Sequence, residues 1–481
     1  MIVGAGVTGL AVAHRSVVRD ARLEVTVLEA GPRHGGKLRS IEVGDLPLPA
    51  GADAFVARKP WAADLCGELG LELETPGDTG AYLWTARGLV PYLRDTPFGI
   101  PGDVGNVLRW PGLSRAGRLR ALQDLVRRKR KGSDDETLGA LLRRRLGDEA
   151  TDLAVGPLLA GLHAGDVDRL SVEATFPELA SWEASQGSLV RGAQAALRLG
   201  GRASASPMFV RPRGGVERLT DALRDRLGSR VRTDATVVGL RPGVEGWPER
   251  WPEGWPERWP ERWPEGWPEG WKVRTSAEEL PADAVVLAIP AAAAGPLLQP
   301  ISPAAAAGLE GIPTASTGCV MLVYPRGTGS ALPEGTGFVV PRSRAPMTAC
   351  TWLSNKWPTD AFDGRAVLRC YVGAVGEEDV LDAGDGELIA ACARHLAALL
   401  ALPAQPEHAA VVRWPGAMPQ YELGHVDRVA GIRAALPPGI FVVGQSYDGV
   451  GVADCVRAAN ETAAAVAVRL ASNARTEETV R

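Results

Sequence analysis

Residues 1–15 read MIVGAGVTGLAVAHR, and this stretch decides the fold that the chain is expected to adopt. Gly4, Gly6 and Gly9 form a G-x-G-x-x-G pattern between an apolar start and a segment of helical periodicity. In such a turn the first glycine permits the tight bend, the second lets the backbone approach a pyrophosphate, and the third lets the helix pack closely on the strand. The N-terminus of the helix then points its amide N–H groups at the phosphates. The stretch therefore predicts a strand–turn–helix unit that binds a dinucleotide.

A second strand is predicted for residues 23–30, LEVTVLEA, which include Glu29 at 20 positions after Gly9. A carboxylate at this distance is the expected partner of a ribose hydroxyl, so the two segments together predict an α/β, doubly wound, Rossmann-like domain. Three residues precede Gly4, whereas a strand usually has about five or six. We therefore expect the natural first strand to begin upstream of Met1.

The next stretch, EAGPRHGGKLRS at residues 29–40, indicates which dinucleotide is bound. An arginine followed by a Gly-Gly pair, directly after the ribose carboxylate, resembles the large superfamily of FAD-dependent amine oxidases and porphyrinogen oxidases. The resemblance implies FAD as the cofactor rather than NAD. The FAD contacts that it implies are Glu29, Arg33, Gly35 and Gly36, with Lys37 near the flavin ring.

Five further stretches narrow the resemblance to the protoporphyrinogen oxidases and the bacterial coproporphyrinogen III oxidases. They are GADAFVARKP (51–60), GPLLAGLHAGDVDRLSVEATFPEL (156–179), RPRGGVERLTDAL (211–223), WPGAMPQYELGHVDRV (414–429) and VVGQSYDGVGVADCVRAANETAAAV (442–466). The A-G-D-x-x-x-L-S and P-Q-Y-x-x-G-H blocks are far more specific than the glycine pattern. The resemblance covers nearly the whole chain apart from a tryptophan repeat and the C-terminal tail.

The activity that this resemblance implies is an oxygen-dependent, FAD-dependent oxidation in heme biosynthesis. Six electrons leave coproporphyrinogen III to give coproporphyrin III, O2 is the final acceptor, and H2O2 is formed. The flavin N5 accepts hydride, so no catalytic side chain is assigned. Oxidation of protoporphyrinogen IX to protoporphyrin IX is the first alternative. A non-catalytic protein that binds a porphyrin and transfers it to the next heme-pathway enzyme is the second, and that enzyme is also a candidate partner.

A second glycine-rich turn, DGVGVAD at residues 448–454, precedes an alanine-rich helical pattern. Its glycines allow the backbone to approach a ligand closely, and the following helix presents an N-terminus. The resemblance implies that this loop covers the isoalloxazine side of FAD. The residues expected there are Gly444, Gly449, Val450 and Gly451.

The substrate has an apolar centre and propionates at its edge, so its cavity should be apolar with a few convergent cations. Arg58 and Lys59 follow the segment that the resemblance places on the substrate side, and Arg39 is a weaker candidate. Gly161 and Ala164 lie in a block that approaches the substrate in the related enzymes. His163 stands where related sequences often have an aromatic residue. We interpret it as a filler of that position and not as a base.

Composition argues against nucleic-acid-binding, metal-binding and membrane-spanning proteins. The chain has 481 residues, of which 45% are hydrophobic and 23% charged, with a net charge of −4. This predicts a globular protein of two or three domains and no nucleic-acid partner. Six scattered cysteines and six dispersed histidines predict no metal site. The longest apolar run, at about 282–298, contains two prolines and is too short for a membrane span. We expect a cytoplasmic location, with peripheral attachment at the inner face of the membrane as the alternative.

The expected domain organisation is discontinuous, with a sheet-rich substrate domain and a helical subdomain beside the FAD-binding domain. The segments are 1–54, 205–295 and 436–472 for the FAD-binding domain, 55–89 and 296–435 for the substrate domain, 90–204 for the helical subdomain, and 473–481 for a disordered tail. The helical subdomain contains the basic run Arg127 to Lys131, which is expected to be a solvated face or a contact with anionic lipid.

Residues 246–271 read GWPERWPEGWPERWPERWPEGWPEGW and hold seven of the fourteen tryptophans. The segment lies between two predicted strands, and a proline in every unit forbids a regular helix or an interior strand. Lengthening a loop costs only about 0.6 kcal/mol per doubling. We interpret the repeat as a tolerated expansion of a hairpin loop, with anchoring at a membrane interface through tryptophan as the alternative.

Overall fold

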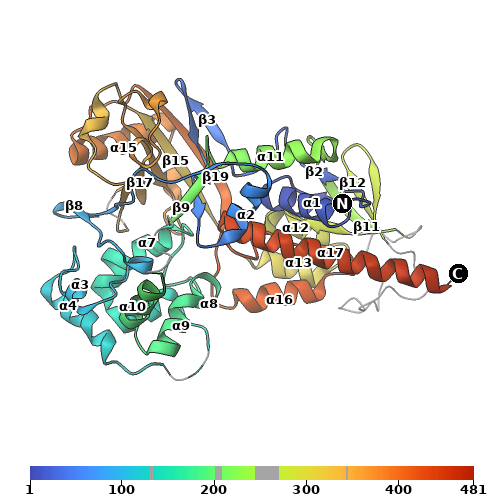
Figure 1. The fold of residues 1–481 in the computed structure, drawn as a ribbon, viewed down its shortest axis with the longest axis horizontal. Coiled ribbons are helices and arrows are strands. Elements are labelled where there is room, and N and C mark those ends of the chain that lie inside the picture. The colour runs from blue at the N-terminus through green and yellow to red at the C-terminus, as the bar shows by residue number, and fades with distance from the viewer. Residues whose placement is uncertain (131, 133, 201–207, 244–269, 343–344, 481) are drawn as a thin grey trace.

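The structure, a computed structural model, has three parts (Figure 1). A parallel sheet with helices on both faces lies at the right, a second sheet at the upper left, and a group of helices at the lower left. The structure describes all residues except 131, 133, 201–207, 244–269, 343–344 and 481, and it describes no side chains for 200 and 472–480.

The parallel sheet has five strands in the order β10-β2-β1-β14-β20. Their bounds are Ile2–Val3 for β1, Val27–Leu28 for β2, Val231–Arg232 for β10, Val285–Leu287 for β14 and Ile440–Val442 for β20. Every neighbouring pair is parallel, and Ile2 of β1 is in register with both Val27 and Val286. The strands come from distant parts of the chain, so the predicted doubly wound, discontinuous domain is confirmed.

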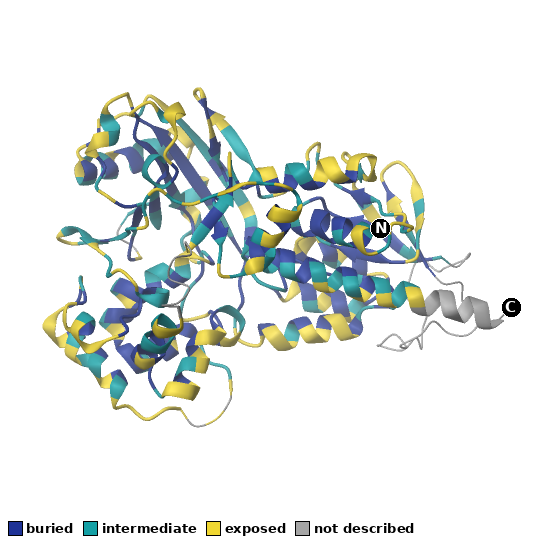
Figure 2. Cartoon of the chain, viewed as in Figure 1, coloured by how far each residue is buried: buried dark blue, intermediate teal, exposed yellow. Residues whose placement is uncertain are grey.

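Both faces of this sheet are buried because side chains alternate between them along each strand. Ile2 packs in the core formed with α1 (Val7–Arg19), α11 (Glu217–Leu227) and α17 (Val452–Val480). Val3 packs in the opposite core, formed with α12 (Ala291–Leu298), α13 (Pro303–Glu310) and α16 (His425–Ala435). Figure 2 shows the resulting buried layer between the helices. The apolar run at 282–298 is explained by these contacts, since it forms β14 and α12.

Some segment boundaries differ from those expected. Helices α13 and α16 lie in stretches assigned to the substrate domain, yet their apolar faces complete the core of the parallel sheet. Helix α2 (Pro60–Glu68) and β5 (Phe55–Val56) likewise pack in the core beside α1. A helical pattern shows which face of a helix is apolar but not which neighbour covers it, so the sequence could not place these elements.

The second sheet has seven strands in the order β19-β15-β18-β17-β16-β7-β8. The strands are β7 (Tyr82–Thr85), β8 (Gly88–Pro91), β15 (Thr314–Val323), β16 (Gly337–Val339), β17 (Ala349–Trp352), β18 (Val367–Val372) and β19 (His408–Pro419). Helix α15 (Asp385–Leu400) covers one face. The other face packs against the hairpin of β3 (Ser40–Val43) and β4 (Leu46–Pro49), which directly follows the Gly-Gly segment.

The third part is helical and holds its own core of leucines and aromatic residues. Its helices are α3 (Val104–Leu108), α4 (Arg115–Leu122), α5 (Leu138–Leu146), α6 (Asp148–Ala150), α7 (Gly156–Gly161), α8 (Val172–Thr175), α9 (Pro177–Gln186) and α10 (Leu189–Gly200). Three short elements lie outside the helical part: β6 (Leu73–Glu74), β9 (Phe209–Pro212) and α14 (Leu353–Lys356). None of the helices in the described part of the chain is long and apolar enough to cross a membrane.

The tryptophan repeat lies mostly outside the described residues, but the strands that flank it are described. They are β11 (Val237–Pro242) and β12 (Trp271–Thr275), which pair as an antiparallel hairpin, and β13 (Glu279–Ala282) pairs with β12. The last tryptophan of the repeat, Trp271, is 1% exposed in the core, and its indole N–H donates to the Pro438 carbonyl at 3.0 Å. The assignment of the whole stretch 246–271 to a loop is therefore wrong at Trp271, because β12 begins there.

At the C-terminus, α17 continues to Val480, whereas the sequence predicted a disordered tail from residue 473. A helix already nucleated at Val452 gains one backbone hydrogen bond for each residue that it adds, so helical structure can extend over polar residues.

Candidate functional site

The glycine-rich turn has the predicted geometry. Gly4 has φ +100°, and a Cβ there would lie 2.6 Å from the Ala288 carbonyl oxygen. A Cβ on Gly9 would lie 2.0 Å from the Gly4 carbonyl oxygen, so this glycine allows α1 to pack on the strand. A Cβ on Gly6 would meet nothing within 4 Å. Gly6 caps α1 without any side-chain hydrogen bond, so the first N–H groups of the helix face open space suited to a phosphate.

Glu29 lies at the end of β2 and is oriented by backbone amides. One carboxylate oxygen accepts a hydrogen bond from Ala5 N–H at 2.8 Å and the other from Gly31 N–H at 3.0 Å. The Gly-Gly segment returns to the same place, because Gly35 N–H donates to the Ala5 carbonyl at 2.8 Å. A Cβ on Gly36 would lie 3.2 Å from the Gly6 Cα. The structure thus brings these predicted residues together around one turn.

Arg33 is exposed, and its guanidinium donates to the carbonyls of His34 and Gly36 within its own segment. Lys37 points the other way, into the molecule. Its ammonium group donates to the Ala417 carbonyl and to Gln445 Oε1, the latter at 2.6 Å. Burial lowers the pKa of Lys37 to about 8. Lys37 therefore connects the Gly-Gly segment to β19 and to the second glycine-rich loop.

That second loop lies against the first. Gly444 has φ +120°, and a Cβ there would lie 3.4 Å from Thr8 Oγ1 on α1. Gly449 has φ +118°, and both Gly449 and Gly451 approach Asp454, where a Cβ would come within 2.7 Å and 2.8 Å of its side chain. Val450 lies between them and is half-buried. The loop therefore packs its backbone close to the predicted dinucleotide turn.

The predicted substrate residues separate into two groups. Lys59 forms an ion pair with Asp454 at 2.7 Å and so reaches the second glycine-rich loop. Arg58 is exposed and has no partner among the described residues. Arg39 stacks its guanidinium 4.8 Å from the centre of the Trp414 ring, with Nε buried and unpartnered. The structure brings Lys59 to the site and leaves Arg58 at the surface.

The block with the A-G-D pattern also reaches this region. Gly161 has open space where a Cβ would lie, and Ala164 adopts φ +46° while its carbonyl accepts from Val375 N–H. His163 is 5% exposed, and Lys59 and His425 contribute to its electrostatic surroundings. Burial, followed by these two groups, lowers the pKa of His163 to about 4. Its ring packs at tilted and edge-on angles near Tyr421 and Phe176, which agrees with a filler of an aromatic position.

Two contributors were not assigned by sequence reasoning. The first is Tyr421, whose hydroxyl donates to the Gln445 carbonyl at 2.6 Å and accepts from Gly449 N–H at 2.8 Å. His425 stacks on its ring, with a centroid distance of 3.9 Å. Both residues belong to the P-Q-Y-x-x-G-H block, so the signal was present, but the sequence did not show which backbone groups they contact.

The second is a buried charge cluster around Asp53, directly after the segment 49–51. Asp53 accepts from Lys356 at 2.9 Å, from Arg369 at 3.1 Å and from the Trp357 indole at 3.0 Å. Burial opposes ionisation, but Arg369 and Lys356 outweigh it and hold the pKa of Asp53 far below its ordinary value. No sequence motif joins residues 53, 356 and 369, so only the fold could reveal this cluster.

A glycine turn, a carboxylate after the second strand and a second backbone loop at one site are typical of flavoprotein oxidoreductases. The chain belongs to the family of flavin containing amine oxidoreductases, whose family model matches residues 7–467. The coproporphyrinogen III oxidase of Bacillus subtilis is 32% identical over 95% of each chain, and that of Mycobacterium leprae is 32% identical over 98% of each. A crystal structure from Exiguobacterium, provisionally assigned as a protoporphyrinogen oxidase, has a TM-score of 0.80, 29% identity and 98% coverage of both chains.

The residues of this chain fit FAD, the cofactor of the family. The uncapped N-terminus of α1 and the open space over Gly6 suit a pyrophosphate. Each carboxylate oxygen of Glu29 accepts one hydrogen bond from the described residues, so acceptor capacity remains for a hydroxyl group such as that of a ribose. Lys37 contacts Gln445 of the loop 444–451, and this loop lies beside α1 at Thr8.

Proposed function

We propose that this chain oxidises coproporphyrinogen III to coproporphyrin III, with FAD as its cofactor and O2 as the final electron acceptor. The observation that carries the proposal is a convergence on the second glycine-rich loop. Lys37 and Lys59 contact Gln445 and Asp454 there, and the A-G-D block contacts Tyr421, whose hydroxyl accepts from Gly449 of the loop. The nearly full-length relatives named coproporphyrinogen III oxidase support the substrate. When bound, FAD supplies the hydride acceptor and so most of the chemistry.

The chain's own residues orient the two reactants. The turn at Gly4 and Gly6, together with Glu29, binds the dinucleotide end of the cofactor. Lys59 provides a positive charge that recognises a propionate at the substrate edge, and Asp454 holds it in place until the substrate binds. Gly161 carries no side chain at the block that faces the substrate, so a flat macrocycle can approach.

The test is aerobic turnover of the FAD-reconstituted protein on coproporphyrinogen III and on protoporphyrinogen IX, followed by porphyrin fluorescence and by H2O2 release. A higher kcat/KM for coproporphyrinogen III supports the proposal, and a higher value for protoporphyrinogen IX favours the first alternative. Absence of turnover on both substrates, with FAD bound, would favour the porphyrin-transfer alternative.

A matched pair of variants tests the substrate contact. Lys59→Met should raise KM by about tenfold, because a charge-assisted hydrogen bond contributes roughly 1.5–3 kcal/mol. Arg58→Met removes the neighbouring cation, which is exposed, and should leave KM within about twofold. Equal effects of the two substitutions would contradict the assignment of Lys59 as a substrate residue.

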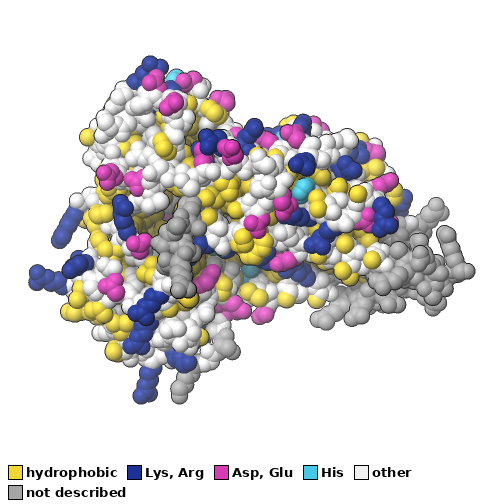
Figure 3. Space-filling model, viewed as in Figure 1, with side chains coloured by type: hydrophobic (Ala, Val, Ile, Leu, Met, Phe, Trp, Pro, Cys, Tyr) yellow, Lys and Arg dark blue, Asp and Glu magenta, His cyan; other side chains and the backbone are white. Residues whose placement is uncertain are grey.

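We propose a cytoplasmic location, with peripheral contact at the membrane as the alternative. One observation supports the peripheral contact. Lys and Arg side chains, which can attract anionic lipid, project from the helical part at the lower left of Figure 3. Leu108, Leu119 and Val126 are exposed on the same part. Co-sedimentation with vesicles containing anionic lipid, compared with vesicles of neutral lipid, distinguishes the two locations.

A further inference from the structure

Tyr421 lies where all three parts of the molecule meet. It follows the end of β19 in the seven-stranded sheet. Its backbone carbonyl accepts a hydrogen bond from Ser171 N–H of the helical part at 2.8 Å. Its hydroxyl reaches the parallel-sheet part, where it contacts the Gln445 carbonyl and Gly449 N–H. One residue therefore connects the A-G-D block, the second sheet and the flavin-binding loop.

The two hydrogen bonds of the hydroxyl fix the loop at both of its ends. Gln445 and Gly449 are four positions apart, and the Tyr421 oxygen bridges them as acceptor from one and donor to the other. The hydroxyl is buried, and burial raises the pKa of Tyr421 well above its ordinary value, so the group keeps the proton that it donates. Without the hydroxyl, the carbonyl of Gln445 and the N–H of Gly449, both in half-buried residues, would lose this partner.

The aromatic ring of Tyr421 is also enclosed by neighbouring side chains. His425 stacks on one face at a centroid distance of 3.9 Å and an angle of 14°, and the His163 ring lies 5.8 Å from it. Tyr421 is 2% exposed. Lys37 binds the side chain of Gln445 from the other direction at 2.6 Å. Gln445 is thus fixed by Tyr421 through its backbone and by Lys37 through its side chain.

We propose that Tyr421 is a positioning residue that holds the loop 445–449 in its flavin-binding conformation and aligns this loop with the substrate-side block at 163–171. The inference rests on the proposed placement of the flavin at this loop. It gives a role to Tyr421, which lies between β19 and α16, and to His425, the first residue of α16, which stacks on its ring.

The test compares two buried tyrosines. Tyr421→Phe keeps the ring and its stacking but removes the bridging hydroxyl. Tyr324→Phe is the control, because Tyr324 lies in the core of the seven-stranded sheet, away from the loop, and its buried hydroxyl has no hydrogen-bond partner within the described part of the chain. We expect Tyr421→Phe to weaken FAD binding to the apoprotein by about tenfold, the order expected when two backbone polar groups lose their partner. Tyr324→Phe should leave FAD affinity within about twofold.

Two further readouts separate positioning from a general structural role. At saturating FAD, Tyr421→Phe should change the visible circular dichroism of the bound flavin and lower kcat, with KM within about twofold. A variant that only lost thermal stability, with wild-type FAD affinity and flavin spectrum, would overturn the inference. FAD affinity does not depend on which porphyrinogen is oxidised, so failure of the proposed substrate would leave this result unaffected.

A measurement on the unsubstituted protein covers the case in which Tyr421→Phe does not fold. Hydrogen–deuterium exchange of the holoprotein should show the Gly449 amide protected, because its N–H donates to a buried hydroxyl. Exchange of that amide at the rate of an open loop would contradict the bridge.

Discussion

Arg145 in the helical part and Arg369 on β18 are both almost fully buried, and their contacts differ. Arg145 binds the carboxylates of Asp124 and Glu183 and several backbone carbonyls, whereas Arg369 binds the carboxylate of Asp53 and two backbone carbonyls. Arg145 makes all its contacts within the helical part. Arg369 joins the seven-stranded sheet to the segment 49–53, which lies against Lys37, a residue that we propose lies near the flavin.

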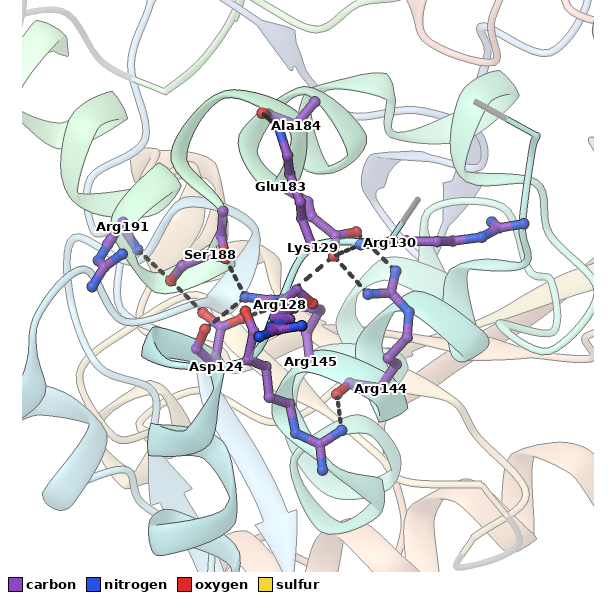
Figure 4. Close-up of polar contacts among 12 residues, drawn as sticks. Asp124, Arg128, Lys129, Arg130, Arg144, Arg145, Glu183, Ala184, Ser188 and Arg191 are labelled. Carbon is purple, nitrogen blue, oxygen red and sulfur yellow. Dashed lines mark hydrogen bonds and ion pairs between the residues drawn. The ribbon is translucent and has the colours of Figure 1, made fainter. Parts of the chain in front are cut away.

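The Arg145 cluster is internally satisfied. Its guanidinium donates to the carbonyls of Asp124 and Gly187, and the Asp124 carboxylate also accepts from Val190 N–H at 2.9 Å and from Ser188 (Figure 4). Arg145 also donates to the carbonyls of Arg127 and Arg128 and so fixes the backbone of the basic run. The side chains of Arg127 to Arg130 are left exposed.

The Arg369 cluster differs because it connects separate parts of the molecule. Its guanidinium donates to the carbonyls of Pro49 at 2.8 Å and Gly51 at 2.7 Å, and it pairs with Asp53. A Cβ on Gly51 would lie 1.9 Å from the Lys37 carbonyl oxygen. The position of Lys37 thus depends on Arg369 through Gly51. The buried Nε of Arg369 has no partner among the residues that the structure describes, so this guanidinium is less completely satisfied than that of Arg145.

The largest effect is expected for Asp124→Asn. Asp124 and Arg145 both have 0% exposed side chains, and the substitution leaves the buried cation with only the longer contact to Glu183 at 3.4 Å. Breaking such a pair costs about 3–5 kcal/mol of unfolding free energy, measured by urea denaturation. FAD affinity of the folded fraction should be unchanged. Glu279→Gln, in the exposed pair with Arg241, is the control and should cost less than about 1 kcal/mol.

Asp53→Asn should destabilise the protein by a similar or somewhat smaller amount, about 2–4 kcal/mol, because Lys356 and Arg369 lose a shared counter-charge. In contrast to Asp124→Asn, it should also weaken FAD binding and lower kcat, since the segment beside Lys37 is no longer fixed. The measurements are urea denaturation and FAD titration of the same samples. If Asp53→Asn and Asp124→Asn had equal FAD affinity, the Arg369 cluster would not differ from the Arg145 cluster in its effect on the site.

His163→Phe tests a buried polar group that has no partner at Nδ1. The pKa of His163 is about 4 in the folded protein, below the ordinary value of 6.5, so the unfolded chain binds more protons between these values. Stability contributed by this site is therefore present above pH 6.5 and is lost as the pH falls towards 4. Between pH 7 and pH 5 the unfolding free energy of the variant should fall by less than that of the wild type, and the difference between the two decreases should be up to about 2 kcal/mol. An identical pH dependence would contradict the pKa assignment.

The smallest effect is expected for deletion of residues 248–267, which removes five repeat units and keeps Trp271. Turnover should be unchanged and the unfolding free energy should change by less than about 1–2 kcal/mol, because the entropy of closing a loop varies slowly with its length. Trp271→Ala is the contrast, since loss of a buried tryptophan costs about 3–5 kcal/mol. Loss of activity on deletion, with FAD still bound, would contradict our interpretation of the repeat.

The sequence alone predicted the class of fold and the cofactor correctly. Gly4, Gly6, Gly9 and Glu29 could be recognised because a phosphate-binding turn imposes its requirements on neighbouring residues. The sequence could not predict that Lys59 contacts the second glycine-rich loop while Arg58 is exposed. Adjacent residues differ in exposure according to which elements pack around them. The same holds for α13 and α16, whose apolar faces were visible but whose partners were not.

What the sequence by itself determined was local: the glycine turn, the second strand with its carboxylate, the hairpin around the repeat, and blocks specific enough to identify the family. Only the tertiary structure decided which distant side chains meet. The bridge from Tyr421 to Gln445 and Gly449 and the pairing of Asp53 with Lys356 and Arg369 join residues from separate segments of the chain. The physical reason is that such contacts are selected by packing of the completed fold, which no short pattern of residues encodes.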